Sequence, residues 1–344
     1  MTKVVSFKMA MNQATKGGAK RPHVLLGNGF SRACRDNIFA YGALFDRANF
    51  DAISANAKRA FEKLKTTDFE AVIRALRNAA TLCELYSGRK DALSKQLQAD
   101  ADGLREVLAK AVAESHPSRP NDISDEEYQA CRVFLGHFDK IYTLNYDLLL
   151  YWTVMHEELE PKILADDGFR SPEQKDVDYV TWEIGNTNKQ NIHYLHGALH
   201  LFDAGSELKK YTWSRTGVAL IDQIRTSLAD DMYPLVVAEG EAKQKKTKID
   251  HSNYLSRSFR SFGAIGGSLF VHGFAMGDSD SHLVKSIANG KVSEMYVGLH
   301  GDPASKANRK IIEKVMQLTN ARSKHYPLTY YFYDSTSANI WGHG

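Results

Sequence analysis

The chain has 344 residues, an apolar fraction of 43% and a formal net charge of +3 at pH 7. This length and apolar content suit an α/β domain that carries a sizeable insertion. The charge is small and scattered, so it gives no electrostatic case for nucleic-acid binding.

The number of cysteines and the length of apolar runs indicate the cellular compartment of the protein. The three cysteines, Cys34, Cys83 and Cys131, form no C-x-x-C pair, which argues against a disulfide framework and a four-cysteine zinc site. No stretch approaches the ~20 apolar residues of a membrane span, and the N-terminus lacks the apolar region of a signal peptide. We therefore expect a cytoplasmic protein without membrane contact.

The first 125 residues predict one strand followed by helices. Residues 1–20 are expected to be a flexible lead-in to a domain over residues 21–344. The run Val24–Leu26 predicts the first strand. Apolar residues at three- and four-residue steps predict helices over 68–86 and 91–115, within a helical insertion at about 48–125.

The second half alternates strand and helix patterns, which predicts an α/β, Rossmann-like, doubly wound and mostly parallel sheet. The lysine-rich stretch 241–251 predicts a solvated polar loop. Strands are expected in 140–146, 191–202, 233–240, 268–276, 294–301 and 328–334, and helices over 253–265, 281–290 and 305–321.

The end of the first strand carries Gly27 and Gly29, then Ser31. Glycines leave backbone amides bare, so phosphate can approach them, and Ser31 adds a hydroxyl donor. The alternative is a tight turn that needs glycine for its backbone conformation.

The second strand end carries Thr143, Asn145 and Asp147 at alternate positions, which places all three on one face if the strand extends that far. Three polar side chains in an apolar run are costly to bury without partners. The alternative is that Asn145 and Asp147 cap a helix that begins at Leu148.

The third strand end carries His196, followed by Gly197, which would let a ligand reach the imidazole. The spacing of His193, His196 and His200 suits a metal site on a helix, but the surrounding pattern indicates strands, so no metal site is expected. A histidine buried in the core is the alternative for His196.

The fourth strand end carries Gly273 and then Asp280 and His282. A carboxylate just beyond a strand can accept hydrogen bonds from ribose hydroxyls. The alternative is that Asp280 caps a helix starting near Ser281.

Taken in order, Gly-x-Gly-Phe-Ser, Thr-x-Asn-x-Asp, His-Gly and a glycine loop with Asp-x-His resemble the sirtuin-like NAD-binding family. The similarity is greatest to the bacterial anti-phage defence branch, and it spans most of residues 24–334. The resemblance implies NAD as the substrate and no metal. It implies that Gly27, Gly29 and Ser31 cradle the pyrophosphate and that Phe39 lies near the nicotinamide, with further NAD contacts from Asn28, Phe30, Thr143, Gly273, Asp280 and His282.

The resemblance also implies three catalytic residues. Asn145 would hold the reacting water or a ribose hydroxyl, Asp147 would face the nicotinamide amide, and His196 would be the general base. Departures from the protein deacetylases of the family put deacetylation in doubt. Ala40 replaces an arginine, Ala275 replaces a serine, and the four zinc-binding cysteines are missing.

These features predict an NAD glycohydrolase that releases nicotinamide and ADP-ribose. The resemblance implies a defence role by NAD depletion, and we expect a homo-oligomer controlled by a regulatory protein or an ATPase partner. An ADP-ribosyl or deacylating transferase and a non-catalytic NAD or ADP-ribose sensor are the alternatives.

Overall fold

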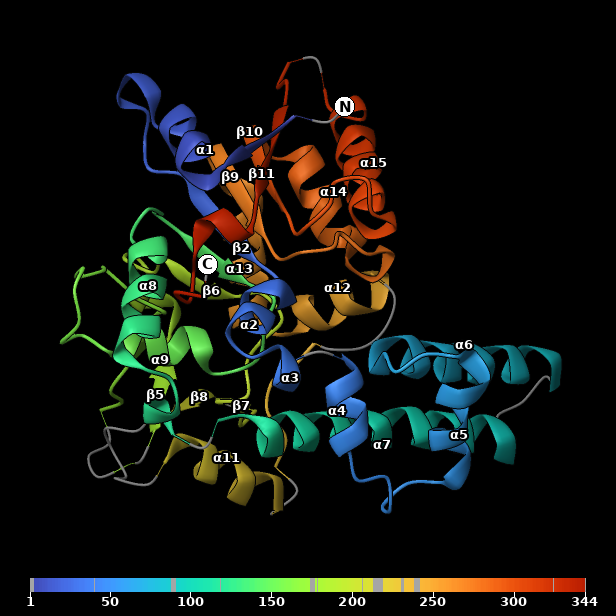
Figure 1. Cartoon of the computed structure of the whole chain (residues 1–344). Helices are drawn as coiled ribbons and strands as arrows, with labels where there is room; N and C mark the ends of the chain where they lie inside the picture. Colours follow the sequence, from blue (N-terminus) through green and yellow to red (C-terminus); the bar gives the residue numbers. More distant parts are fainter. Residues whose placement is uncertain are drawn as a thin grey trace.

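The computed structural model describes residues 3–39, 41–87, 91–117, 119–173, 177, 179–205, 207–212, 219–229, 232–237, 242–323 and 325–343. Ala40 lies outside these residues. Figure 1 shows a central sheet with helices on both faces and a group of helices that extends to one side.

The described strands form two sheets. A seven-stranded sheet has the order β1-β11-β10-β9-β2-β3-β6, with every neighbouring pair parallel, and a four-stranded antiparallel sheet has the order β4-β5-β8-β7. The strands are β1 (Val4–Ser6), β2 (His23–Leu26), β3 (Ile141–Thr143), β4 (Phe169–Arg170), β5 (Tyr179–Trp182), β6 (Ile192–Tyr194), β7 (Leu201–Asp203), β8 (Leu208–Tyr211), β9 (Gly266–His272), β10 (Lys291–Leu299) and β11 (Thr329–Asp334).

Helices cover both faces of the large sheet. Because strand side chains alternate, Val24 and Leu26 of β2 join a core with α1, α8 and α9, whereas Leu25 joins a core with α14 and α15. The helices are α1 (Phe7–Ala14), α2 (Asn28–Cys34), α3 (Asp36–Phe39), α4 (Tyr41–Arg47), α5 (Ala55–Leu64), α6 (Phe69–Ser87), α7 (Ala92–Ser115), α8 (Asp125–Leu135), α9 (Leu149–Met155), α11 (Leu220–Ala229), α12 (Ala242–His251), α13 (Asn253–Ala264), α14 (Ser281–Asn289) and α15 (Lys306–Asn320).

The strand order confirms the α/β, doubly wound, Rossmann-like fold. From β2 the chain adds β3 and β6 on one side, then crosses to add β9, β10 and β11 on the other. The order therefore reverses between β2 and β9, and in such sheets ligands bind beyond the carboxyl ends of the strands at this point.

Two segments, residues 4–14 and residues 191–202, differ from the sequence-based expectations. Residues 4–14 are not a loose lead-in, because β1 pairs in parallel with β11 and α1 buries Phe7 and Ala10. The pattern at 191–202 is not one strand: β6 ends at Tyr194 and β7 begins at Leu201, in different sheets. The short strands of the antiparallel sheet had no distinct sequence signal apart from β7.

The stretch 233–251 also differs from the strand and the loop that the sequence predicts. Within 233–237 the chain makes only an isolated bridge, Val236 to Gly197, and residues 238–240 of the expected strand lie outside the described residues. The expected solvated loop is helix α12. It forms because Lys245 and Ile249, four residues apart, are both buried, so one face of the helix packs inward.

The helical insertion begins earlier than the expected residue 48, because α4 (Tyr41–Arg47) already belongs to it. It runs to α7, with α6 and α7 packed along each other. Its last residues tie it to the core through His116, which is 2% exposed. The Nδ1 of His116 hydrogen-bonds the Pro117 carbonyl, and its Nε2 accepts from the Leu148 amide at 3.1 Å, so the ring is neutral. Burial lowers the pKa of His116 to about 4.

No helix among the described residues has the length and apolar character needed to cross a membrane.

We expect Gly29→Ala to lower the free energy of unfolding by at least about 2 kcal/mol, because its Cβ would lie 2.5 Å from the Gly273 Cα and neither backbone can yield. Urea denaturation measures this loss. Gly185→Ala is the control, because a Cβ there has no atom within 4 Å. Equal stability of the two variants would contradict the close approach.

We expect the fold to lose stability as the pH falls below about 6.5. The unfolded chain then protonates His116 while the folded chain does not until about pH 4, so the free energy of unfolding falls by about 1.4 kcal/mol per pH unit for this residue. Urea denaturation between pH 5 and pH 8 gives the slope. His116→Asn should reduce it by that amount, whereas His325→Asn, at an exposed position, should leave it unchanged.

Candidate functional site

The carboxyl ends of β9, β2, β3 and β6 meet along one edge of the sheet, and backbone hydrogen bonds continue beyond the strands there. The Gly27 amide donates to His272 O, Leu144 to Leu26 O and Leu195 to Thr143 O, each at 2.9 Å. The four segments singled out in the sequence therefore lie side by side.

The glycines at this edge serve a close approach between the loops after β2 and β9. A Cβ on Gly27 would lie 2.6 Å from the Gly273 carbonyl oxygen, and Gly273 has a φ of +67°. The Gly29 amide donates to Gly273 O at 2.9 Å, and the Phe30 amide donates to Gly27 O. These amides are thus bonded within the protein, and phosphate would have to displace those bonds to use them.

Asn145 belongs to a buried polar network at the ends of β2 and β3. Its side-chain Nδ2 donates to Gly27 O at 3.1 Å and to Ser31 Oγ at 2.7 Å, while its backbone amide donates to Thr143 Oγ1. Ser31 Oγ donates to Asp147. This network fixes the Asn145 side chain, and it uses the Ser31 hydroxyl that the sequence predicted for phosphate.

Asp147 bonds the first residue of α9, which agrees only in part with the alternative interpretation, because α9 begins at Leu149 and Asn145 does not cap it. Its Oδ1 accepts from the Leu149 amide at 3.0 Å while its other oxygen accepts from Ser31. Burial raises the pKa of Asp147, against the lowering effect of these hydrogen bonds. Asp147 therefore acts on Asn145 through Ser31.

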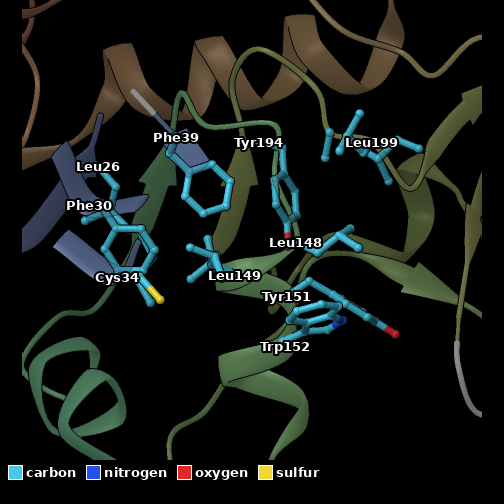
Figure 2. Packing of buried hydrophobic residues seen from close by; sticks show 14 of the residues in the cluster. Leu26, Phe30, Cys34, Phe39, Leu148, Leu149, Tyr151, Trp152, Tyr194 and Leu199 are labelled. Carbon is cyan, nitrogen blue, oxygen red and sulfur yellow. The ribbon is translucent and has the colours of Figure 1, made fainter. Parts of the chain in front are cut away.

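Phe39 lies in the core. Figure 2 shows its ring among buried side chains that include Leu26, Phe30 and Leu149. It also makes an edge contact with His116 at 5.8 Å between ring centroids, and its carbonyl accepts from Asn28 Nδ2. The aromatic residue expected near the nicotinamide is thus a packing residue here.

His196 joins a second cluster with Asp280, at the end of a short 3₁₀ turn (Asp278–Asp280), and His282 of α14. The Nε2 of His196 lies 3.4 Å from Nε2 of His282 and 3.9 Å from Oδ1 of Asp280. These three residues could hold a metal ion, because one potential ligand atom from each lies within 4.8 Å of the others. His193 and His200 lie elsewhere, against Tyr142 and Tyr151 respectively.

Lys245 of α12 completes this cluster, and the sequence reasoning missed it. Its side chain is 1% exposed and its Nζ donates to Asp280 Oδ1 at 3.0 Å. Burial would raise the pKa of Asp280, yet His196 and Lys245 together hold it below its ordinary value. The signal that could have found Lys245 is its four-residue spacing from the apolar Ile249.

Both histidines of the cluster are neutral near pH 7. Burial lowers the pKa of His196 to about 3, and the Lys245 charge adds to this effect. Burial also lowers the pKa of His282 to about 4. The glycine after His196 has a structural reason of its own, since a Cβ on Gly197 would lie 1.8 Å from the Leu235 carbonyl oxygen.

A cavity of about 460 Å³ is lined by neighbours of both networks, and the described residues that line it include no member of either network. Tyr146 follows Asn145 and lines it, and Val237, whose amide donates to His196 O at 2.8 Å, lines it too. The insertion contributes Arg105 and α12 contributes Lys248. Burial, with the charges of Arg77 and Arg105, lowers the pKa of Lys248 to about 8.

The side chains of Asn145 and His196 diverge at this edge. Asn145 turns toward β2, whereas His196 turns toward α12 and α14, and no hydrogen bond among the described residues links them. The cavity adjoins the backbone next to each residue, so a ligand that contacts both networks would have to span it.

The family model described as "Domain of unknown function (DUF4917)" matches residues 24–341. Comparison with curated proteins gave no match. The matched range begins in β2, ends after β11 and contains both polar networks. The chain belongs to the DUF4917 family.

Proposed function

We propose that this protein cleaves NAD at the bond between nicotinamide and ribose and releases nicotinamide and ADP-ribose. The observation that carries the proposal is a cavity lined by Tyr146, which follows Asn145, and by Val237, whose amide donates to His196 O. It lies near the edge of a doubly wound sheet where ligands of such folds bind. The resemblance of the strand-end motifs to sirtuin-like proteins supports a dinucleotide as the ligand.

The cavity wall supports binding of a pyrophosphate. Arg105 of α7 and Lys248 of α12 both line it, and each side chain brings a cationic group that can pair with phosphate oxygens. We assign the pyrophosphate to this wall because its two cationic groups line the cavity, whereas the amides of Gly27 and Gly29 donate to protein carbonyls and do not line it.

Cleavage needs a positioned water, because the departing nicotinamide leaves an electron-poor sugar. Asn145 suits this role: its Nδ2 is held by Gly27 O and Ser31, and no described residue donates to its Oδ1. That oxygen can accept a hydrogen bond from water and stabilise the positive charge that develops on the sugar. Asp147 is then a positioning residue.

His196 has a different part from the strong general base that the resemblance implies. With a pKa of about 3 it is neutral and weakly basic, so we assign its imidazole to accepting a hydrogen bond from a ribose hydroxyl. The proton that water loses on attack passes to solvent.

A sensor that binds NAD or ADP-ribose without turnover is the second candidate. The low basicity of His196 and the internal saturation of Ser31 favour it. An uncontrolled NAD hydrolase would deplete the NAD of the cell. If the protein is a hydrolase, we therefore propose that a homo-oligomer or a partner controls it, consistent with the defence role that the resemblance implies.

We expect purified full-length protein to convert NAD into equal amounts of nicotinamide and ADP-ribose, measured by chromatography at several protein concentrations. His196→Gln should lower kcat by a hundredfold or more, on the order expected for a lost catalytic hydrogen-bonding group.

His272→Gln is the matched control, since His272 is a buried histidine at the end of β9 that bonds Tyr333 instead. Saturable NAD binding without products would favour the sensor, and ADP-ribose on protein would favour the transferase. If NAD neither bound nor reacted, the proposal would be wrong.

We expect Arg105→Gln to raise the KM for NAD about tenfold or more with kcat little changed, because a lost phosphate contact removes binding that is uniform between ground and transition states. Steady-state kinetics measure this split. Lys95→Gln is the control, because Lys95 is exposed on the same helix and does not line the cavity. An unchanged KM for Arg105→Gln would place the pyrophosphate elsewhere.

A further inference from the structure

The cluster of His196, Asp280 and His282 brings three side chains from separate parts of the chain to one point. His196 follows β6, Asp280 ends a 3₁₀ turn and His282 lies in the first turn of α14. His196 and His282 are buried, the Asp280 side chain is 18% exposed, and one ligand-type atom from each lies within 4.8 Å of the others.

We infer that this cluster binds a divalent transition-metal ion, with Zn²⁺ as the best fit to its ligands. Two imidazoles and one carboxylate are a zinc-ligand set that leaves a fourth position open. Imidazole nitrogens about 2.0–2.1 Å from a tetrahedral zinc lie about 3.3–3.4 Å apart. The Nε2 atoms of His196 and His282 are 3.4 Å apart, and Asp280 Oδ1, 3.9 Å from His196 Nε2, must move closer to complete the ligand set.

Lys245 is the competitor for this ion. Its ammonium group bonds Asp280 Oδ1 at 3.0 Å and is buried, so it already neutralises the carboxylate. A metal ion that binds Asp280 therefore meets the repulsion of the ammonium charge and competes with it for Oδ1. Removal of the lysine charge should therefore strengthen metal binding, whereas loss of either histidine should weaken it.

Metal binding has a consequence for the proposed hydrolysis. The ion would occupy Nε2 of His196, so it would block the hydrogen bond to ribose and Zn²⁺ would inhibit NAD cleavage. This consequence rests on the proposed function, whereas metal binding itself does not.

The test is a Zn²⁺ titration of the full-length protein, stripped of metal with EDTA, against a chromophoric chelator. We expect one saturable ion per chain. His282→Gln should weaken binding at least about tenfold, and Lys245→Met should strengthen it by about tenfold. His325→Gln, at an exposed histidine outside the cluster, should bind as the parent does.

A thermal unfolding experiment gives an independent readout. Lys245→Met leaves Asp280 without its buried lysine, so its melting temperature in EDTA should be lower than that of the parent and should rise again with Zn²⁺. The double variant Lys245→Met/His282→Gln should show no such recovery.

Two results would overturn the inference: no saturable Zn²⁺ binding by the parent, or equal Zn²⁺ affinity of the parent and His282→Gln. The affinity comparison stands even if Lys245→Met does not fold. None of these readouts uses NAD, so absence of NAD cleavage would leave the metal site unaffected, and absence of metal binding would leave the hydrolysis proposal unaffected.

Discussion

The contact between the loops that follow β2 and β9 is the constraint on which the rest of the carboxyl edge depends. At Gly29 and Gly273 the two backbones lie so close that a single Cβ would collide with main-chain atoms. This contact lies at the point where the strand order of the sheet reverses. It also fixes the position of Gly27, whose carbonyl accepts from Asn145 Nδ2, so backbone packing determines where the Asn145 side chain lies.

Local patterns in the sequence predicted the parallel sheet because its strands are short, apolar and separated by helical repeats. They also found most polar residues at the strand ends, since alternation marks Asn145 and Asp147 without knowledge of the fold. The same patterns left the functional and structural meanings of these residues open. The structure adds their contacts: Asp147 accepts from the first amide of α9, and the Gly27–Gly29 turn packs against Gly273.

Features made by distant contacts escaped prediction. The segment 241–251 is rich in lysine, so its composition indicated a solvated loop, yet the burial of Lys245 depends on Asp280, which lies 35 residues further along the chain. Strand β1, which precedes the strand expected at Val24–Leu26, was missed for a similar reason. Residues Val4–Ser6 form a strand only because β11 offers an edge to pair with. Short antiparallel strands such as β4 likewise need partners that local sequence does not reveal.

The two networks at this edge are held by different parts of the chain, and α12 contributes to only one of them. The amide network around Asn145 is fixed by the sheet itself. The histidine cluster instead takes its charge balance from Lys245, which α12 supplies, and Lys248 on the same helix lines the cavity. Because residues three apart lie on neighbouring positions of a helix face, a shift of α12 would alter the charge beside His196 and the cationic cavity wall together. One helix therefore supplies a cationic group both to the cluster and to the cavity wall.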